Sequence, residues 1–374
     1  MLPAAKPDAP SLADVLESCL ASVQSTPAVI PLPAVDRAIV VLIDGLGAEA
    51  LAARSGHART LASAQTSKAA IVSGFPSTTA SAITSLTTGL RAGQHGIVGY
   101  SALDPEGDRV VNQLTGWGGQ VDPHEWQPHP TLFEQAVSVG LAAAAIGPER
   151  YRDSGFTRVA LRGADYLAGS TVDDRVSRAI EWLGRSGPGI AYLYIPELDV
   201  AAHAKGWMSG EWTAALETAD SALRRLAASL GPRDGMLVTA DHGIVDVPHH
   251  AHILVDAAPE LLEGVRHIAG EPRCLQLHLD PTADADAVLS RWSDSESSRS
   301  WVASRDEVIG SGWYGPVADA VLPRMGDIYV AARKSVAYYD SRTAGSARNM
   351  IGQHGSFTQP EVRVPLLRFG AFAT

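Results

Sequence analysis

Residues 38–47 read AIVVLIDGLG, six consecutive apolar side chains followed by Asp44 and Gly45. A short apolar run that ends at glycine is typical of a strand buried on both faces, as in a parallel sheet. A helical pattern followed by an apolar strand recurs three times downstream, in residues 131–147, 173–199 and 211–243. The first of these begins with Thr131 and Glu134 at the spacing of a capping box. Strands that alternate with helices predict an α/β fold, with a mostly parallel central sheet sandwiched by helices.

One internal segment departs from this alternation. Residues 256–345 contain strand-like runs at 275–280 and 326–332, and the polar run SDSESSRS between them. We interpret this segment as a small inserted cap subdomain of α+β type. The core is then formed by residues 1–255 and 346–374, and the last stretch is expected to return to the main sheet.

Composition excludes several classes of protein. The chain has 374 residues, 45% hydrophobic content and a formal net charge of −11, so it has a large core and no broad basic face for duplex nucleic acid. Its two cysteines form no disulfide framework and no thiolate metal site. The N-terminal segment lacks the features of a signal peptide, and no apolar run is long enough for a membrane span. We therefore expect a cytoplasmic protein, monomeric or dimeric, without a membrane partner.

Acidic and histidine side chains fall where the predicted strands end. These positions meet at the carboxyl edge of a parallel sheet, which is where α/β proteins place ligand sites. Mixed carboxylate and imidazole ligands suit Zn²⁺ or Mn²⁺, and six ligands fit two ions with open positions. The candidates are Asp44, Asp199, His203, Asp241, His242 and His354.

A candidate nucleophile lies in the run GFPSTTASAITSLTTGL, residues 74–90. Gly74, Phe75 and Pro76 interrupt the chain, and the hydroxyl residues 77–79 precede a helical pattern. A hydroxyl at the start of a helix lies in positive potential among backbone N–H groups, which could also bind a phosphate oxygen.

Each motif alone has a simpler interpretation. Asp44-Gly45 can be a turn, the hydroxyl cluster a helix cap, Asp199 and His203 a surface pair, and His354 an ordinary surface histidine. The ordered set favours the metal site, because the members lie at the ends of predicted strands. The three histidines at 249, 250 and 252 are interpreted as loop residues, since no predicted strand presents them.

The ordered motifs resemble the alkaline phosphatase superfamily and, within it, the type I phosphodiesterase / nucleotide pyrophosphatase family. The matching stretches are VVLIDGLG (40–47), FPSTTASAITSLTTGLRAGQHGIVGY (75–100), ELDVAAHAKG (197–206), TADHGI (239–244) and GQHGS (352–356). The resemblance implies an alkaline phosphatase-like fold with two divalent metal ions. One ion would be held by Asp199, His203 and His354, and the other by Asp44, Asp241, His242 and the nucleophile Thr79. Ser77 and Thr78 remain alternatives if the register is displaced by one or two residues.

The chain departs from the family at one phosphate-binding position, where Tyr100 replaces a common Asn. Tyr100 and Phe75 are expected to contact substrate, and Trp117 and Trp207 are further aromatic candidates. The HGIVGY stretch and the HGSFTQPE tail resemble a cytosolic bacterial branch that hydrolyses cyclic di-AMP to linear pApA and then AMP, with Mn²⁺. The expected function is therefore a two-metal phosphodiesterase with a nucleotidyl-threonine intermediate. The alternatives are a nucleotide pyrophosphatase, a phosphonate hydrolase of the phosphonoacetate type, a phosphomonoesterase, and an inactive nucleotide-binding sensor.

Overall fold

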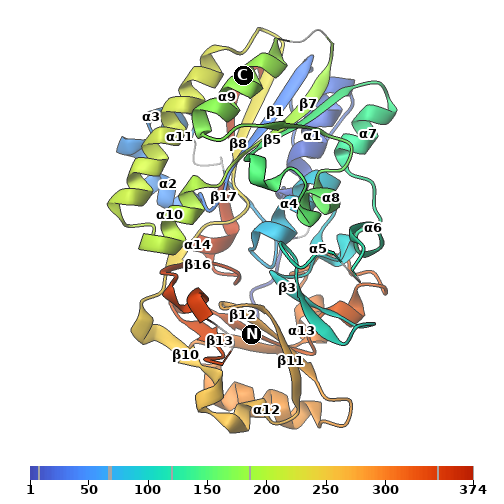
Figure 1. Cartoon of the computed structure of the whole chain (residues 1–374), viewed down its shortest axis with the longest axis vertical. Helices are drawn as coiled ribbons and strands as arrows, with labels where there is room; N and C mark the ends of the chain where they lie inside the picture. The colour runs from blue at the N-terminus through green and yellow to red at the C-terminus, as the bar shows by residue number, and fades with distance from the viewer. Residues whose placement is uncertain (7–8, 66–69, 119–120, 185–186, 343–344, 374) are drawn as a thin grey trace.

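A six-stranded sheet forms the centre of the larger part of the molecule (Figure 1). The computed structural model describes residues 1–6, 9–65, 70–118, 121–184, 187–342 and 345–373. The strand order is β18-β8-β1-β7-β5-β6, and all neighbours are parallel except β18 with β8. The strands are β1 (Arg37–Ile43), β5 (Ala142–Gly147), β6 (Asp165–Ala168), β7 (Gly189–Ile195), β8 (Asp234–Thr239) and β18 (Leu367–Gly370). The predicted α/β class and mostly parallel sheet are confirmed.

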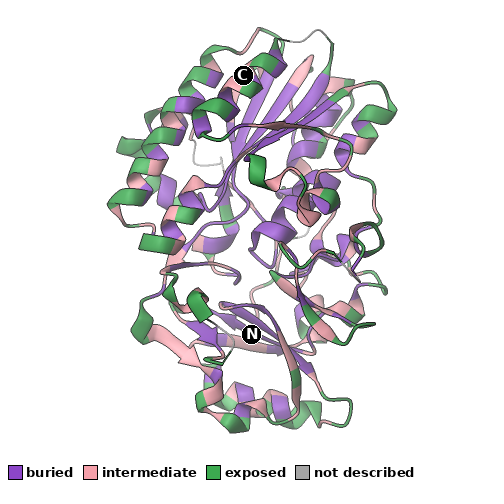
Figure 2. Ribbon diagram, in the orientation of Figure 1, coloured by how far each residue is buried: buried purple, intermediate pink, exposed green. Residues whose placement is uncertain are grey.

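The inner strands are buried along nearly their whole length, which is why their sequences are continuous apolar runs (Figure 2). Their register aligns the carboxyl ends: Ile43 lies opposite Ile195, and Leu42 lies opposite Thr239. The residues that follow β1, β7 and β8 therefore emerge together at one edge of the sheet.

Helices cover both faces of this sheet (Figure 1). One group packs together as α1 (Ala13–Gln24), α4 (Thr79–Thr88) and α7 (Leu132–Ser138), and the other as α9 (Val172–Leu183), α10 (Glu197–Lys205) and α11 (Gly210–Ala228). The predicted capping box at the start of α7 is present, with Thr131 and Glu134 each bonding the other's backbone N–H. The shorter helices are α2 (Ala48–Ala53), α3 (Arg59–Ser63), α5 (Ala92–His95), α6 (Pro123–Trp126), α8 (Gly155–Ala160) and α14 (Gln359–Val362).

A second, antiparallel sheet lies below the first in Figure 1, in the order β11-β12-β14-β13. Its elements all come from the segment predicted to be an insert: β11 (Val265–Glu271), β12 (Cys274–Leu279), α12 (Ala285–Glu296), β13 (Ser300–Ser304), α13 (Arg305–Gly310) and β14 (Ile328–Ala332). Trp292 of α12 is completely buried against this sheet. The exact division into domains stays a prediction.

The C-terminal stretch joins the two parts of the molecule. Glu361 of α14 forms a buried bidentate ion pair with Arg273, which immediately precedes β12, at 2.7 Å for each of two N–H···O contacts. The chain then returns to the main sheet as β18, as predicted, but in the antiparallel direction. Four short strand pairs complete the structure: β2 (Ala70–Val72) with β17 (Arg363–Pro365), β3 (Ser101–Asp104) with β4 (Arg109–Asn112), β9 (Val245–Asp246) with β16 (Gly352–Gln353), and β10 (His252–Leu254) with β15 (Ala337–Tyr339).

Two other expectations concern the cysteines and membrane-spanning helices. Cys19 and Cys274 are both buried and form no disulfide, in agreement with the absence of a disulfide framework expected from the sequence. None of the helices in the described ranges combines the length and apolarity that crossing a lipid bilayer requires.

Candidate active site and metal centre

The predicted metal ligands converge at the carboxyl edge of the central sheet. Asp44 directly follows β1, Asp241 and His242 follow β8, and Asp199 lies in the first turn of α10 after β7. His354 arrives from a distant part of the chain, directly after β16. Within the described part of the chain, these side chains form two groups in which the potential ligand atoms lie within 4.8 Å of one another: Asp199, His203 and His354, and Asp44, Asp241 and His242.

The first group is organised by Asp199. Its Oδ2 lies 3.1 Å from His203 Nε2, one helical turn further along α10. Its Oδ1 lies 3.9 Å from His354 Nε2. The i, i+4 spacing of Asp199 and His203 therefore places a carboxylate and an imidazole side by side, and the C-terminal stretch supplies the third candidate ligand.

The second group is organised by His242. Its Nε2 lies 3.3 Å from Asp44 Oδ1 and 3.5 Å from Asp241 Oδ2. The Asp241 Oδ1 atom accepts the backbone N–H of Gly45 at 3.2 Å, which fixes the orientation of that carboxylate. The hydroxyl of Tyr194 on β7 donates to Asp44 Oδ2 and orients the other one.

The two groups are adjacent, and their histidines share one pattern of hydrogen bonding. The rings of His242 and His354 stack with centroids 3.6 Å apart. Each of the three histidines places Nδ1 against a backbone carbonyl: His203 against Gly352 at 2.7 Å, His354 against Ser77 at 2.8 Å and His242 against Gly243 at 3.0 Å. An Nδ1–H held in this way leaves Nε2 as the lone-pair donor, which is the usual arrangement of metal-binding histidines.

The donor set fits divalent cations. Among the residues that the structure describes, Asp44 Oδ1, Asp199 Oδ1 and Asp241 Oδ2 are buried carboxylate oxygens without a hydrogen-bond partner, which is unfavourable unless a cation lies beside them. Burial and the repulsion of neighbouring carboxylates raise the pKa values of Asp44 and Asp241. Burial also opposes ionisation of Asp199, but the charges of His203 and His354 lower its pKa overall. Bound cations would relieve the remaining repulsion.

Thr79 lies beside the second group as the first residue of α4. Its Oγ1 is 3.2 Å from His242 Nε2. Of the two alternatives, Ser77 donates its hydroxyl to Ser356 O at 2.7 Å, and Thr78 is the N-terminal capping position of α4. Among the three hydroxyls, only that of Thr79 has a contact with a candidate metal ligand in the described structure. The first turn of α4 also presents backbone N–H groups that have no partner within the helix.

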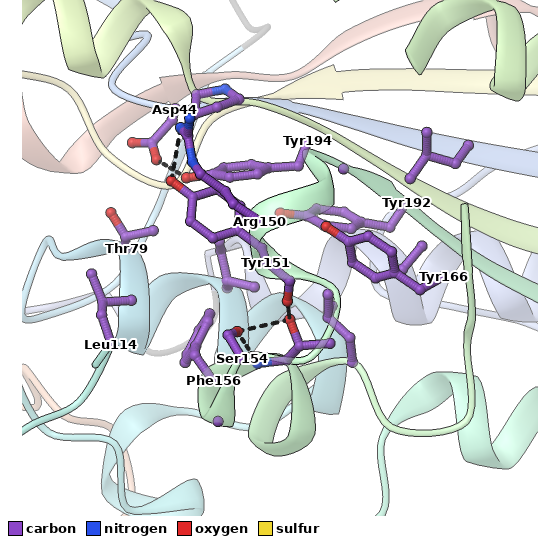
Figure 3. A pocket seen from close by; sticks show the side chains of 18 of the residues that line it. Asp44, Thr79, Leu114, Arg150, Tyr151, Ser154, Phe156, Tyr166, Tyr192 and Tyr194 are labelled. Atoms are coloured by element: carbon purple, nitrogen blue, oxygen red, sulfur yellow. Dashed lines mark hydrogen bonds between the residues drawn. The ribbon is translucent and has the colours of Figure 1, made fainter. Parts of the chain in front are cut away.

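A cavity of about 530 Å³ opens from this site (Figure 3). Asp44, Thr79 and Asp199 contribute to its wall beside the metal centre. The remaining wall is largely aromatic and apolar, with one arginine, and includes Leu114, Arg150, Tyr151, Phe156, Tyr166, Tyr192 and Tyr194. Figure 3 shows Tyr194 next to Asp44, with Tyr192 and Tyr166 further along the cavity.

This aromatic lining was not predicted from the sequence. Tyr192 and Tyr194 alternate on β7, just before Asp199, so the period of two residues was a usable signal that both point to one face. Tyr151 ends a 3-10 turn and Tyr166 lies on the short strand β6. No local pattern indicates that either ring faces the cavity, because that depends on tertiary packing.

The proposed aromatic contacts lie elsewhere. Phe75 is only 2% exposed and packs among Trp313, Tyr314 and Phe357, so its ring has no accessible face for a substrate. Trp117 packs against Trp126, and Trp207 against Trp212. Tyr100 is 40% exposed, but it lines a separate cavity beside β11.

The three histidines after β8 belong to neither ligand group. His249 and His250 lie in a 3-10 turn, as the loop interpretation implies, but His252 opens the short strand β10. The expectation that no strand presents them was therefore wrong for His252. Its pairing with β15 depends on a residue more than 80 positions away, which no local pattern reveals.

The sequence profile of the type I phosphodiesterase / nucleotide pyrophosphatase family matches residues 38–357, most of the chain. The chain belongs to this family. The motifs that carried the resemblance span the same range, so the resemblance to the family is confirmed. The narrower resemblance to a cyclic di-AMP branch stays a prediction.

Curated members and relatives match over shorter stretches. An uncharacterized pyrophosphatase/phosphodiesterase of Schizosaccharomyces pombe is 24% identical over 230 residues, which cover 58% of this chain and 47% of that protein. A phosphopentomutase of Symbiobacterium thermophilum is 30% identical over 137 residues, which cover 36% of this chain and 33% of that protein. The chain therefore spans less than half the length of these two relatives.

Solved structures share the fold over nearly the whole chain. Murine ectonucleotide pyrophosphatase / phosphodiesterase 5 superposes with a TM-score of 0.68 at 18% identity and covers 89% of this chain and 88% of its own. Phosphonoacetate hydrolase from Sinorhizobium meliloti, solved with phosphonoacetate, gives a TM-score of 0.70 at 18% identity and covers 90% and 91%. These likenesses confirm the predicted alkaline phosphatase-like fold.

Proposed function

We propose that the chain is a two-metal phosphodiesterase that cleaves a nucleotide phosphodiester through a covalent nucleotidyl-threonine at Thr79. The observation that supports this most strongly is the position of Thr79 Oγ1 at a helix start, 3.2 Å from His242 Nε2. His242 in turn lies beside Asp44 and Asp241, each of which has one buried carboxylate oxygen without a hydrogen-bond partner among the described residues. A binding module has no need of a hydroxyl in this position beside six ligand-type side chains.

Two divalent cations, Mn²⁺ or Zn²⁺, are the cofactors that this donor set suits. Asp199, His203 and His354 would hold one, and Asp44, Asp241, His242 and Thr79 the other. When bound, such cations supply positive charge that stabilises the phosphorane-like transition state and makes hydroxyl deprotonation easier.

The residues of the chain then divide the reaction into two displacements. Thr79 Oγ1 attacks phosphorus in line and loses its proton, while the bond from phosphorus to the leaving oxygen breaks and that oxygen is protonated. Water then cleaves the bond between phosphorus and Thr79 Oγ1, so the configuration at phosphorus is retained overall. Backbone N–H groups in the first turn of α4 are oriented to bind a phosphoryl oxygen throughout.

The cavity beside Thr79 and Asp44, which we call the tyrosine-lined cavity, favours a nucleotide as the substrate. Its volume of about 530 Å³ is in the range of small-molecule sites, and its aromatic walls offer stacking surfaces for a nucleobase. A structural neighbour, an inactive variant of murine ectonucleotide pyrophosphatase / phosphodiesterase 5, was solved in complex with AMP. Together with the resemblance of the HGIVGY and HGSFTQPE stretches, this leads us to propose cyclic di-AMP as substrate, hydrolysed to pApA and then AMP.

A metal-reconstituted substrate panel tests this function. Purified protein is treated with EDTA, reloaded with Mn²⁺ or Zn²⁺, and incubated with cyclic di-AMP, pApA, a nucleotide sugar and phosphonoacetate, with products identified by mass. We expect diester hydrolysis that needs metal and is abolished by Asp241→Asn with the fold intact. Near-normal turnover by Asp241→Asn, or no hydrolysis of any nucleotide diester with any metal, would contradict the proposal.

A phosphonate hydrolase is the second candidate, because phosphonoacetate hydrolase shares the fold at a TM-score of 0.70. A substrate with a carboxylate needs cationic side chains beyond the metal centre. Among residues that line the tyrosine-lined cavity, Arg150 is the single cation, while most of the wall is apolar. Release of inorganic phosphate from phosphonoacetate in the panel, without diester cleavage, would favour this candidate.

A further inference from the structure

A second cavity lies on the side of the antiparallel sheet and has no part in the reaction as proposed. Its volume is about 610 Å³, and β3, β4, β11 and β15 all contribute to its wall. It shares no lining residue with the tyrosine-lined cavity. We refer to it as the lower cavity, and its lining includes Tyr100, Val110, Arg266, His267, Tyr339 and Arg342.

The lower cavity adjoins the candidate metal centre through both neighbours of His354. On one side, Gln353 donates its side-chain N–H to the hydroxyl of Tyr339 at 2.9 Å. On the other side, Gly355 is packed so closely on Glu271 that a Cβ there would lie 2.2 Å from Glu271 Cγ. Tyr339 and Glu271 both line the lower cavity. The tyrosine-lined cavity contains Thr79 and Asp44, whereas the lower cavity adjoins the centre through the residues that contact Gln353 and Gly355.

Glu271 also fixes the position of Tyr100. Its buried carboxylate accepts the backbone N–H of Tyr100 at 2.8 Å. The ring of Tyr100 is left 40% exposed at the wall of the lower cavity, where it presents an aromatic face. An exposed aromatic ring held by its backbone is a suitable stacking surface for a base.

Side chains of both charges line the lower cavity. Arg266, His267 and Arg342 lie there together with Glu271 and Asp340. Arg266 and His267 share the carboxylate of Asp108, and Arg342 pairs with Asp340. A guanidinium has five N–H donors, so an arginine with one carboxylate partner can also bind a phosphate oxygen.

We propose that the lower cavity is a second nucleotide subsite, which takes one nucleotide unit of a dinucleotide while the other lies in the tyrosine-lined cavity. This inference rests on the proposed function, and it explains why the substrate would contain two nucleotides. A substrate with a single nucleotide would leave one of the cavities empty. The subsite recognises a base through Tyr100 and a phosphate through Arg266, and it therefore sets selectivity for a dinucleotide over a small diester.

Two variants test the subsite by different routes. Arg266→Glu reverses one charge of the lower cavity, and Val110→Trp fills its volume from β4, where Val110 is 37% exposed and tolerates a larger side chain. Lys334→Glu is the matched control, because it makes the same charge change on an exposed residue after β14 that does not line the lower cavity. Far-UV circular dichroism and thermal unfolding confirm that each variant folds.

Binding and turnover are measured separately. Binding of pApA is measured by calorimetry in a Thr79→Ala background with Mn²⁺, so that the ligand is not consumed. Turnover is measured with Thr79 intact, as kcat/KM for pApA and for bis-p-nitrophenyl phosphate, which is too small to reach both cavities. We expect Arg266→Glu and Val110→Trp to weaken pApA binding and kcat/KM about tenfold or more, since the first removes a charge-assisted contact and the second occupies the space of the nucleotide. Turnover of bis-p-nitrophenyl phosphate and all properties of Lys334→Glu should stay within about twofold.

The outcomes distinguish the two proposals. Unchanged pApA binding in both variants, or equal losses on both substrates, would overturn the subsite. If the unmodified chain hydrolyses neither substrate, the phosphodiesterase proposal fails, and the binding measurements still decide whether the lower cavity holds a nucleotide.

Discussion

The hydroxyl of Tyr194 is predicted to control metal affinity at the group formed by Asp44, Asp241 and His242. It donates to Asp44 Oδ2, Asp44 is buried and Tyr194 is half-buried, and Asp44 Oδ1 remains available to a cation. Tyr194→Phe removes one donor and keeps the ring. A hydrogen bond to a charged group contributes about 1.5–3 kcal/mol, which corresponds to a loss of metal affinity of about 10- to 100-fold.

The effect should also depend on pH in a defined direction. Burial and the neighbouring carboxylates raise the pKa of Asp44, and the hydrogen bond from Tyr194 lowers it. Without that donor the pKa of Asp44 rises further, so protons compete more strongly with the cation. The loss of affinity should therefore be larger at about pH 6 than at about pH 8.

Tyr192→Phe supplies a matched control, because Tyr192 lies two residues away on the same face of β7 and its buried hydroxyl has no partner. The assay is calorimetric titration of EDTA-treated protein with Mn²⁺, repeated as the metal dependence of diester hydrolysis. We expect Tyr192→Phe to bind metal like the unmodified chain. Equal Mn²⁺ affinity in the Tyr194→Phe and Tyr192→Phe variants would refute the assigned role of the Tyr194 hydroxyl.

Three further predictions concern stability. Arg273→Met leaves the carboxylate of Glu361 buried without its cation, so urea unfolding should show a loss of about 3–5 kcal/mol, and a loss below about 1 kcal/mol would contradict it. Burial raises the pKa of Glu271 to about 8 from an ordinary value near 4.5, so the folded state holds this proton more tightly than the unfolded chain. Its contribution to stability should be intact below about pH 4.5 and be lost as the pH rises to about 8, a dependence that should be absent from chemical unfolding of Glu271→Gln. Asp44→Asn relieves repulsion between buried carboxylates, so it should raise the unfolding temperature of EDTA-treated protein, at roughly 2 °C per kcal/mol, and reduce the stabilisation by added Mn²⁺ in calorimetry. An unchanged unfolding temperature without metal would count against carboxylate repulsion.

Local patterns predicted the elements of the fold well where a single periodicity dominated. The apolar run of β1, the capping box at Thr131 and the helical stripe of α11 each depend on residues within a few positions of one another. The direction of β18 could not be predicted, because strand pairing in parallel or antiparallel sense is decided by where the chain re-enters the sheet. The same reason explains why the strand at His252 was missed.

The candidate metal ligands were predictable for a related reason. Asp44 and Asp241 each follow a buried strand, so a parallel sheet by itself brings them to one edge. His354 lies beyond the antiparallel sheet in the chain, and its assignment to the same ion as Asp199 and His203 was inferred from the family resemblance alone. The structure places its ring 3.6 Å from that of His242, a proximity that no spacing in the sequence contains.

By itself, the sequence determined the class of fold, the family and the six acidic and histidine side chains, because these depend on short motifs and on periodicity. Tertiary structure alone decided which cavities these side chains border. The tyrosine-lined cavity and the lower cavity are each assembled from segments far apart in the chain, and their walls exist only once the sheet, its helices and the antiparallel sheet are packed. The burial of Phe75 and the exposure of Tyr100 follow from the same packing. The exposure of a side chain depends on which residues pack around it in the fold, and the adjacent sequence does not specify them.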